Sequence, residues 1–283
     1  MPKKLHFLLI IFFLAFFNFS GIAQENDFQH GLMNVGMGGV IGGIGAVINK
    51  APDQTLGKTL LKGFAQGAIG GYFVFESKRL VRRFAREKKY NYIWPSKLVN
   101  AAGNSIIENA AANRNFWERM HLNLAFNRIE IDFKNRFKLK YRIMPFALSR
   151  AAYLFTQARL DVDRSMVFGT LVFSQRIPEI LGEKGSNGKA MLSSILLRRG
   201  SGQRTEAHEI IHTYQFENFS GINTIFDRPR SRLEQESKFV RIYNKIFHTD
   251  FNALFSQGLY SLETEIKGYR ENSFEKEARH FSE

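Results

Sequence analysis

The stretch Thr205-Glu206-Ala207-His208-Glu209-Ile210-Ile211-His212-Thr213-Tyr214-Gln215 contains the pattern His-Glu-x-x-His. On a helix, residues four positions apart lie one turn apart on the same face, so His208 and His212 can bind one metal ion together. Glu209 then lies beside the ion, where hydrolysis needs a general base. The flanking residues fit a helix, because Thr205 is a suitable N-cap and Ser220-Gly221 follows the apolar positions.

Length and composition leave room for one large domain, or for a medium domain with a smaller unit. The chain has 283 residues, of which 44% are hydrophobic. It contains no Cys, so metal binding depends on His and carboxylates. The net charge of +14 favours anionic partners, but no phosphate loop, zinc-finger spacing or basic-aromatic pattern points to nucleic acid.

The first 23 residues are typical of an export signal. Lys3 and Lys4 precede an apolar run from Leu8 to Phe17, and Gly21-Ile22-Ala23 fits a cleavage site. We therefore expect an exported protein that is periplasmic, envelope-associated or secreted. An uncleaved membrane anchor is the alternative interpretation.

Residues 24–95 are predicted to form a Gly-rich helical hairpin that ends in a basic helix. Glycines recur every two to four positions from Gly36 to Gly45 and again from Gly57 to Gly71, which allows two helices to approach closely. The basic residues that follow at 78–89 would lie outside the membrane if the hairpin spanned it, so a soluble or peripheral hairpin is favoured. The basic helix at 77–90 is either a solvated surface or a contact with an anionic membrane.

Residues 96–283 are predicted to form an α+β domain. A helix at 96–120 precedes alternating apolar positions that indicate an antiparallel β-meander of about five strands, and helices continue from residue 222 to the end. The last strand, Met191 to Leu197, leads into the His-Glu-x-x-His helix. It is either an edge strand that can pair with an extended peptide or a core strand. The expected strands lie at 122–133, 137–143, 152–160, 165–174 and 189–197.

A catalytic zinc ion needs a third protein ligand and an open position for water. Several residues after the motif have suitable side chains. The residues alone leave Glu277, Glu234, Glu236 and His248 as alternatives.

The sequence His208-Glu209-Ile210-Ile211-His212 resembles the metal-binding helix of the zincin metallopeptidases. The later Phe274-Glu275-Lys276-Glu277-Ala278 is similar to the Glu-x-Glu-Ala segment of the gluzincin branch. The resemblance implies that Glu277 is the third zinc ligand beside His208 and His212, and that Glu209 is the catalytic base. It covers the motif helix and the C-terminal segment.

These observations predict a zinc-dependent metallopeptidase that hydrolyses a peptide or protein substrate. Glu209 would take a proton from the attacking water and deliver it to the leaving amine. The additional oxyanion donor is one of Tyr214, Tyr260, Tyr269 and His280. The alternatives are a non-enzymatic envelope protein that binds a partner, and a structural zinc site without catalysis.

Overall fold

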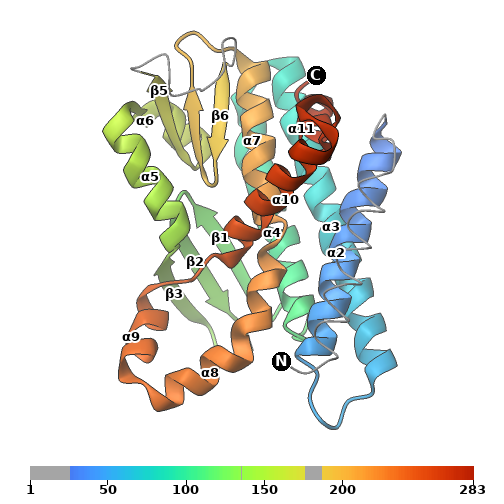
Figure 1. Cartoon of the computed structure of the whole chain (residues 1–283). Helices are drawn as coiled ribbons and strands as arrows, with labels where there is room; N and C mark the ends of the chain where they lie inside the picture. Colours follow the sequence, from blue (N-terminus) through green and yellow to red (C-terminus); the bar gives the residue numbers. More distant parts are fainter. Residues whose placement is uncertain (1–25, 135, 176–186) are drawn as a thin grey trace.

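The computed structural model describes residues 26–134, 136–175 and 187–283, which form an α+β fold (Figure 1). The predicted export signal lies outside this part of the chain. A three-stranded antiparallel sheet and a mixed four-stranded sheet lie on one side of the central helices α4 (Ile93–Ala111) and α7 (Gln203–Glu217), and the N-terminal hairpin lies on the other. The α+β class expected from the sequence is confirmed.

The hairpin consists of α2 (Asp27–Ile48) and α3 (Leu56–Glu87). A Cβ atom added at Gly67 would lie 2.1 Å from the carbonyl oxygen of Gly38, and one added at Gly42 would lie 2.4 Å from that of Gly63. These two helices therefore touch through their backbones, and larger residues would force them apart. Helix α2 is long and apolar enough to cross a membrane, but 56% of its apolar window is buried against the rest of the molecule.

The basic segment is the continuation of α3. Val81 and Phe84 are fully buried and pack in one core cluster with Ile195 of β7 and Ile210 of α7. The hairpin and the rest of the described chain therefore share a core.

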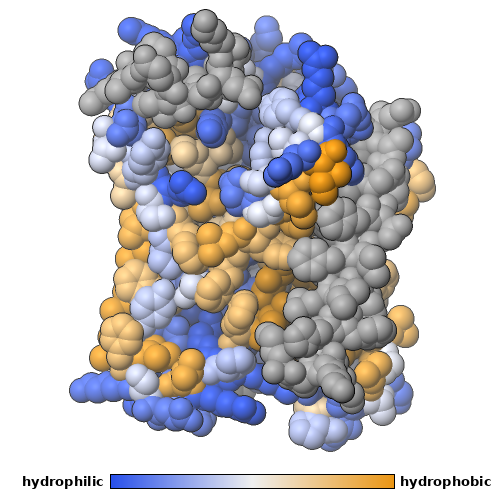
Figure 2. All heavy atoms as spheres, in the orientation of Figure 1, coloured by the Kyte–Doolittle hydropathy of each residue, from blue (hydrophilic) through white to orange (hydrophobic). Residues whose placement is uncertain are grey.

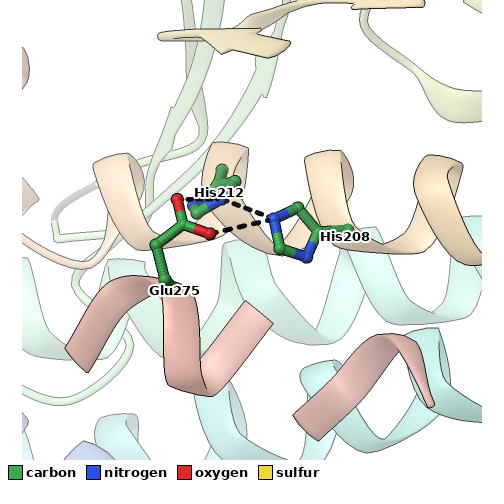
Figure 3. Close-up of side chains that lie close together, drawn as sticks. All are labelled: His208, His212 and Glu275. Carbon is green, nitrogen blue, oxygen red and sulfur yellow. Dashed lines mark hydrogen bonds and ion pairs between the residues drawn. The ribbon is translucent and has the colours of Figure 1, made fainter. Parts of the chain in front are cut away.

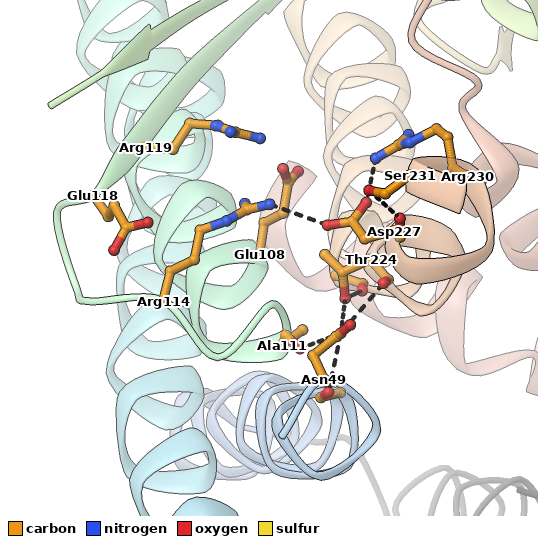
Figure 4. A network of polar contacts seen from close by, with 12 residues as sticks. Asn49, Glu108, Ala111, Arg114, Glu118, Arg119, Thr224, Asp227, Arg230 and Ser231 are labelled. Carbon is orange, nitrogen blue, oxygen red and sulfur yellow. Dashed lines mark hydrogen bonds and ion pairs between the residues drawn. The ribbon is translucent and has the colours of Figure 1, made fainter. Parts of the chain in front are cut away.

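The end of α2 is fixed by the side chain of Asn49 (Figure 4). Its amide donates to the carbonyl oxygen of Ala111, at 2.9 Å, and to that of Thr224, at 3.2 Å. Ala111 ends α4 (Ile93–Ala111), and Thr224 belongs to the 3-10 helix η3 (Ser220–Phe226). This contact joins three segments that are far apart in the sequence.

The three-stranded sheet has the order β1-β2-β3, with β1 (Arg119–Leu124), β2 (Asn127–Asp132) and β3 (Lys138–Ile143). All neighbours are antiparallel, with Met120 opposite Ile131 and Ile131 opposite Leu139. The strand expected at 137–143 corresponds to β3, whereas the single strand expected at 122–133 forms two strands, because the chain turns at Ala125 and Phe126.

Beyond residue 143 the meander prediction is only partly right. Strands at 158–161, 171–175, 188–191 and 194–197 overlap the predicted ranges, but they include a parallel pair, and two helices stand where strands were expected. Residues 152–157 belong to helix α5 (Pro145–Gln157), and residues 165–168 to α6 (Val162–Phe168). Pro145 is well suited to the first turn of a helix, and the buried residues Ala147, Ala151 and Leu154 follow helical spacing. The apolar residues at 152–157 fit both helical and strand spacing, so the pattern alone does not distinguish the two.

The four-stranded sheet has the order β4-β5-β7-β6, and its strands β5 and β7 are parallel. Its strands are β4 (Ala158–Asp161), β5 (Leu171–Gln175), β6 (Gly188–Met191) and β7 (Ser194–Leu197). Every residue of β7 is buried, so the strand before the motif helix is a core strand. The edge strand beside it is β6.

Helix α7 (Gln203–Glu217) carries the His-Glu-x-x-His motif and leads into the C-terminal helices. Helix α11 packs across α7 and α3. The C-terminal segments are α8 (Asp227–Glu236), α9 (Lys238–Ile246), α10 (Phe251–Lys267), the 3-10 helix η4 (Tyr269–Glu271) and α11 (Ser273–Ser282).

Candidate metal centre

The two histidines of the motif meet on one face of α7, as their spacing predicts. The Nε2 atoms of His208 and His212 are 3.1 Å apart. Ile210, Ile211 and Tyr214 pack in the core on the inner side of the helix, which holds the helix in place. The rings therefore start from a rigid element, as a metal site requires.

The third member of the group is Glu275, in the first turn of α11 (Figure 3). Its Oε1 lies 3.3 Å from Nε2 of His212, and its Oε2 lies 3.3 Å from Nε2 of His208. The ligand atoms of His208, His212 and Glu275 all lie within 4.8 Å of one another. Two imidazoles and one carboxylate in this arrangement can hold a metal ion.

The carboxylate of Glu275 is held in the ionised form. Burial acts to raise its pKa, but the imidazoles of His208 and His212 outweigh burial and keep the pKa well below its ordinary value. Asn272 caps the N-terminus of α11, where the helix dipole also favours an anion. Tyr260 donates to Oε1 at 2.8 Å, and Oε2 faces Nε2 of His208 at 3.3 Å and the guanidinium of Arg279 at 4.0 Å. The carboxylate therefore lies among positive and donor groups, and a metal ion would take the place of the contacts with the two rings.

His212 is oriented by a chain of hydrogen bonds on its other side. Its Nδ1 lies 2.8 Å from Oε1 of Gln215, and Nε2 of Gln215 donates to Oε2 of Glu277 at 2.8 Å. Because the Gln215 amide nitrogen is engaged with Glu277, its oxygen is left to accept from Nδ1. This leaves the Nε2 lone pair of His212 for a metal ion, the arrangement usual for histidine ligands.

Without a metal ion, the neighbours of His212 favour its protonated form. Burial acts to lower its pKa, but the hydrogen bond and charge of Glu275 and the charge of Glu209 raise it to about 9. A metal ion would therefore replace a proton on this ring at neutral pH.

Glu209 lies where the motif places it, between α7 and the edge strand β6. Burial raises the pKa of its carboxyl group, and the backbone N–H of Ala190 donates to it. A Cβ atom at Gly188 would lie 2.8 Å from Oε1 of Glu209, so a larger residue there would displace the carboxylate. A carboxyl group with a raised pKa, close to both histidines, is suited to accept a proton during hydrolysis.

The glutamate chosen from the sequence, Glu277, is not brought to the two histidines. Its Oε2 accepts from Nζ of Lys78 at 2.7 Å, and its Oε1 accepts from Nδ2 of Asn34 at 2.7 Å. Residues two positions apart on a helix face in different directions, so only one of Glu275 and Glu277 can face the rings. Of the two glutamates, Glu275 is the one that lies with the histidines, whereas Glu277 accepts a hydrogen bond from Gln215.

The other ligand candidates lie elsewhere in the described structure. Glu234, on α8, accepts from Asn244, and Glu236 ends the same helix. His248 is buried beside Asn223 and Glu130. None of the three belongs to the group formed by His208, His212 and Glu275.

The choice of oxyanion donor narrows to two tyrosines. The hydroxyl of Tyr214 is 3.0 Å from Oγ of Ser96, and His280 lies against Asp27. Tyr260 and Tyr269 lie beside Glu275, and burial, with the charge of that carboxylate, raises the pKa of both. Both phenols therefore stay protonated and can donate at neutral pH.

Some basic residues of the helix predicted to contact a membrane, residues 77–90, form ion pairs within the protein. Lys78 is fully buried against Glu277, and Arg82 pairs with Asp27 at 2.5 Å. Arg83 and Lys88 remain exposed. The membrane contact of this helix stays a prediction.

Comparisons of the chain with protein-family models, curated proteins and solved structures return no match. The functional assignment therefore depends on the residues and geometry described above.

Proposed function

We propose that the protein is an exported zinc-dependent peptidase whose metal ligands are His208, His212 and Glu275. The carrying observation is that the ligand atoms of these three residues converge within 4.8 Å. Two histidines and one glutamate form a ligand set found in catalytic zinc sites, where three protein ligands leave one position open. His212 and Glu275 are buried and His208 is partly buried, so the three side chains form a largely enclosed set that fits a divalent cation.

When bound, zinc supplies Lewis-acid chemistry, which acidifies water and polarises a carbonyl group. Glu209 takes the proton from the attacking water and then gives it to the leaving amine. Its burial beside the three ligands supports this role, because a raised pKa makes the carboxylate a stronger base for the proton of the water. Tyr260 donates to Oε1 of Glu275 and fixes its position. Tyr269, which is half exposed and also contacts Glu275, is the phenol that we assign as the oxyanion donor.

The test compares Glu209→Gln with the parent chain. Glutamine preserves shape but cannot accept the proton, so hydrolysis of an unfolded protein such as casein should fall by about 10²-fold or more. Zinc content, measured by elemental analysis, should stay at the level of the parent. Glu234→Gln is the matched control because this carboxylate lies on α8, and it should leave both quantities unchanged.

Two outcomes would contradict this function. Hydrolysis by Glu209→Gln at the parent rate would remove Glu209 from the mechanism. A parent chain that binds zinc but shows no chelator-sensitive hydrolysis would indicate a structural metal site instead.

A further inference from the structure

The three-stranded sheet buries its polar face. Arg128 and Glu130 of β2 are each 1% exposed, and His121 of β1 is also buried. Arg128 forms ion pairs with Glu108 of α4 at 2.8 Å and with Glu130 at 2.6 Å. Helix α4 packs against β1 and carries the partner of this arginine. The inward face of the sheet is therefore charged and paired.

The opposite face of the sheet is apolar. Because side chains alternate along a strand and directly paired residues share a face, eight apolar residues lie on this face together with Asn127. We call the eight the apolar sheet face: Met120, Leu122, Leu124, Ile129, Ile131, Leu139, Tyr141 and Ile143. The exposed fractions are 63% for Leu139 and 56% for Tyr141, on the edge strand β3. Antiparallel sheets usually bury such a face and solvate the polar one.

Exposed aromatic and basic side chains gather at the β2–β3 end of this sheet. Phe133 is 50% and Phe137 67% exposed. Lys134, Arg136 and Lys138 lie beside them, and residues 133–143 contain no Asp or Glu. Aromatic rings next to long cationic side chains are typical of a protein surface at the membrane–water interface.

Helix α9 adds a second apolar and basic element next to β3. Phe239 is 75% exposed, and Ile242 and Ile246 are also exposed on this short helix. Lys238 and Lys245 lie at its two ends. Figure 2 shows the apolar residues over α9 beside hydrophilic residues along the edge formed by α8. No residue of α8 or α9 is buried, so both helices project from the body of the protein.

We propose that the apolar sheet face, with Phe133, Phe137 and α9, docks onto a bilayer that contains anionic phospholipids. Apolar side chains enter the interfacial region, and the surrounding lysines and arginines contact lipid phosphates. Residues 133–143 contain five basic residues and no acidic one. Lys134 pairs with Glu118 and Arg142 with Glu130, whereas Arg136, Lys138 and Lys140 are exposed and favour a negatively charged lipid surface. This contact is independent of the metal centre and differs from the one predicted for residues 77–90, because Lys78 and Arg82 are engaged within the protein.

The test places a single reporter on each surface. The chain contains no Cys, so Leu139→Cys and Arg83→Cys can each carry one environment-sensitive fluorophore. We expect the emission at position 139 to shift to the blue with vesicles of phosphatidylcholine and phosphatidylglycerol. It should shift less with phosphatidylcholine alone, and added salt should reduce the response. The emission of the label at position 83, an exposed position on α3, should not shift.

Neutral substitutions then test the basic residues. Arg136→Gln with Lys138→Gln should lower vesicle affinity about tenfold or more, since each cation near an anionic surface contributes to binding. The matched pair Arg83→Gln with Lys88→Gln should change the affinity by less than about twofold. Unchanged circular dichroism spectra show that each variant is folded.

Three outcomes would overturn the proposal. The first is no shift at position 139 with anionic vesicles, or an equal shift with phosphatidylcholine alone. The second is a shift at position 83 without one at 139, which assigns the membrane contact to α3. The third is a shift at 139 that grows with protein concentration in the absence of vesicles, which assigns the face to a second copy of the chain.

Discussion

The two sheets of this protein bury opposite kinds of residue: one buries apolar side chains and the other buries charged side chains. The four-stranded sheet buries Phe173, Ile195 and Leu196 completely, as strands of a core sheet normally do. The three-stranded sheet buries Arg128 and Glu130 and leaves apolar residues on its outer side. The comparison teaches that alternation along a strand identifies its two faces, whereas the neighbouring helix decides which face is buried.

The largest effect is expected from removing the central charge of the three-stranded sheet. Arg128→Met leaves Glu108 buried without its cation, and the free energy of unfolding should fall by about 4 kcal/mol. Urea unfolding measures the loss. Adding Glu108→Gln should recover most of it, because Glu130 retains its pair with Arg142. If Arg128→Met alone were as stable as the parent, the buried ion pairs would contribute nothing to the free energy of unfolding.

The second prediction compares alanine substitutions of two residues of similar size, one in each sheet. Ile195→Ala opens a cavity in the buried strand β7 and should cost about 3.5 kcal/mol. Leu139→Ala, on the exposed side of β3, should change the free energy of unfolding by less than about 0.5 kcal/mol. Both are measured by urea unfolding without lipid. Equal losses would mean that the outer face of the three-stranded sheet is covered in solution.

The third prediction concerns pH and the buried histidine of β1. Burial, followed by the charge of Arg128, lowers the pKa of His121 to about 4. Between pH 6.5 and 4 the unfolded chain binds a proton at this site and the folded chain does not, so stability falls as the pH falls. The loss from His121 is at most about 3 kcal/mol at pH 4.

The measurement is the free energy of unfolding as a function of pH. His121→Gln should make the fall below pH 6.5 shallower, but not abolish it, because burial also lowers the pKa of His248. An unchanged slope in His121→Gln would contradict the assignment. The strands of the four-stranded sheet contain no histidine and add nothing to this slope.

The sequence predicted the parts of the fold that depend on local spacing. The glycines of α2 and α3 indicated close helix packing, and the separation of His208 and His212 placed both rings on one face. Strict alternation located the residues of the three-stranded sheet, but it did not indicate the turn at Ala125 and Phe126 that divides the predicted strand 122–133 into β1 and β2. The prediction of a strand at 152–160 is wrong for residues 152–157, which belong to α5, because their apolar residues satisfy strand and helix patterns alike.

The choice between the two glutamates of α11 could not be made from local sequence. Phe274, Ala278 and Phe281 form a buried apolar stripe along this helix. At 100° per residue, Glu275 and Glu277 flank the stripe from opposite sides, and both are buried. Their partners, the motif histidines for one and Lys78 for the other, come from distant segments that only the fold brings together.

Zinc content in two neighbouring variants is the most direct test of the central claim, that His208, His212 and Glu275 bind the metal ion. The parent chain should hold about one zinc ion, and Glu275→Gln should lose it. Glu277→Gln, paired with Lys78→Met so that no buried charge is left alone, should retain most of it. Zinc retained in Glu275→Gln but lost in the Glu277 variant would contradict the account.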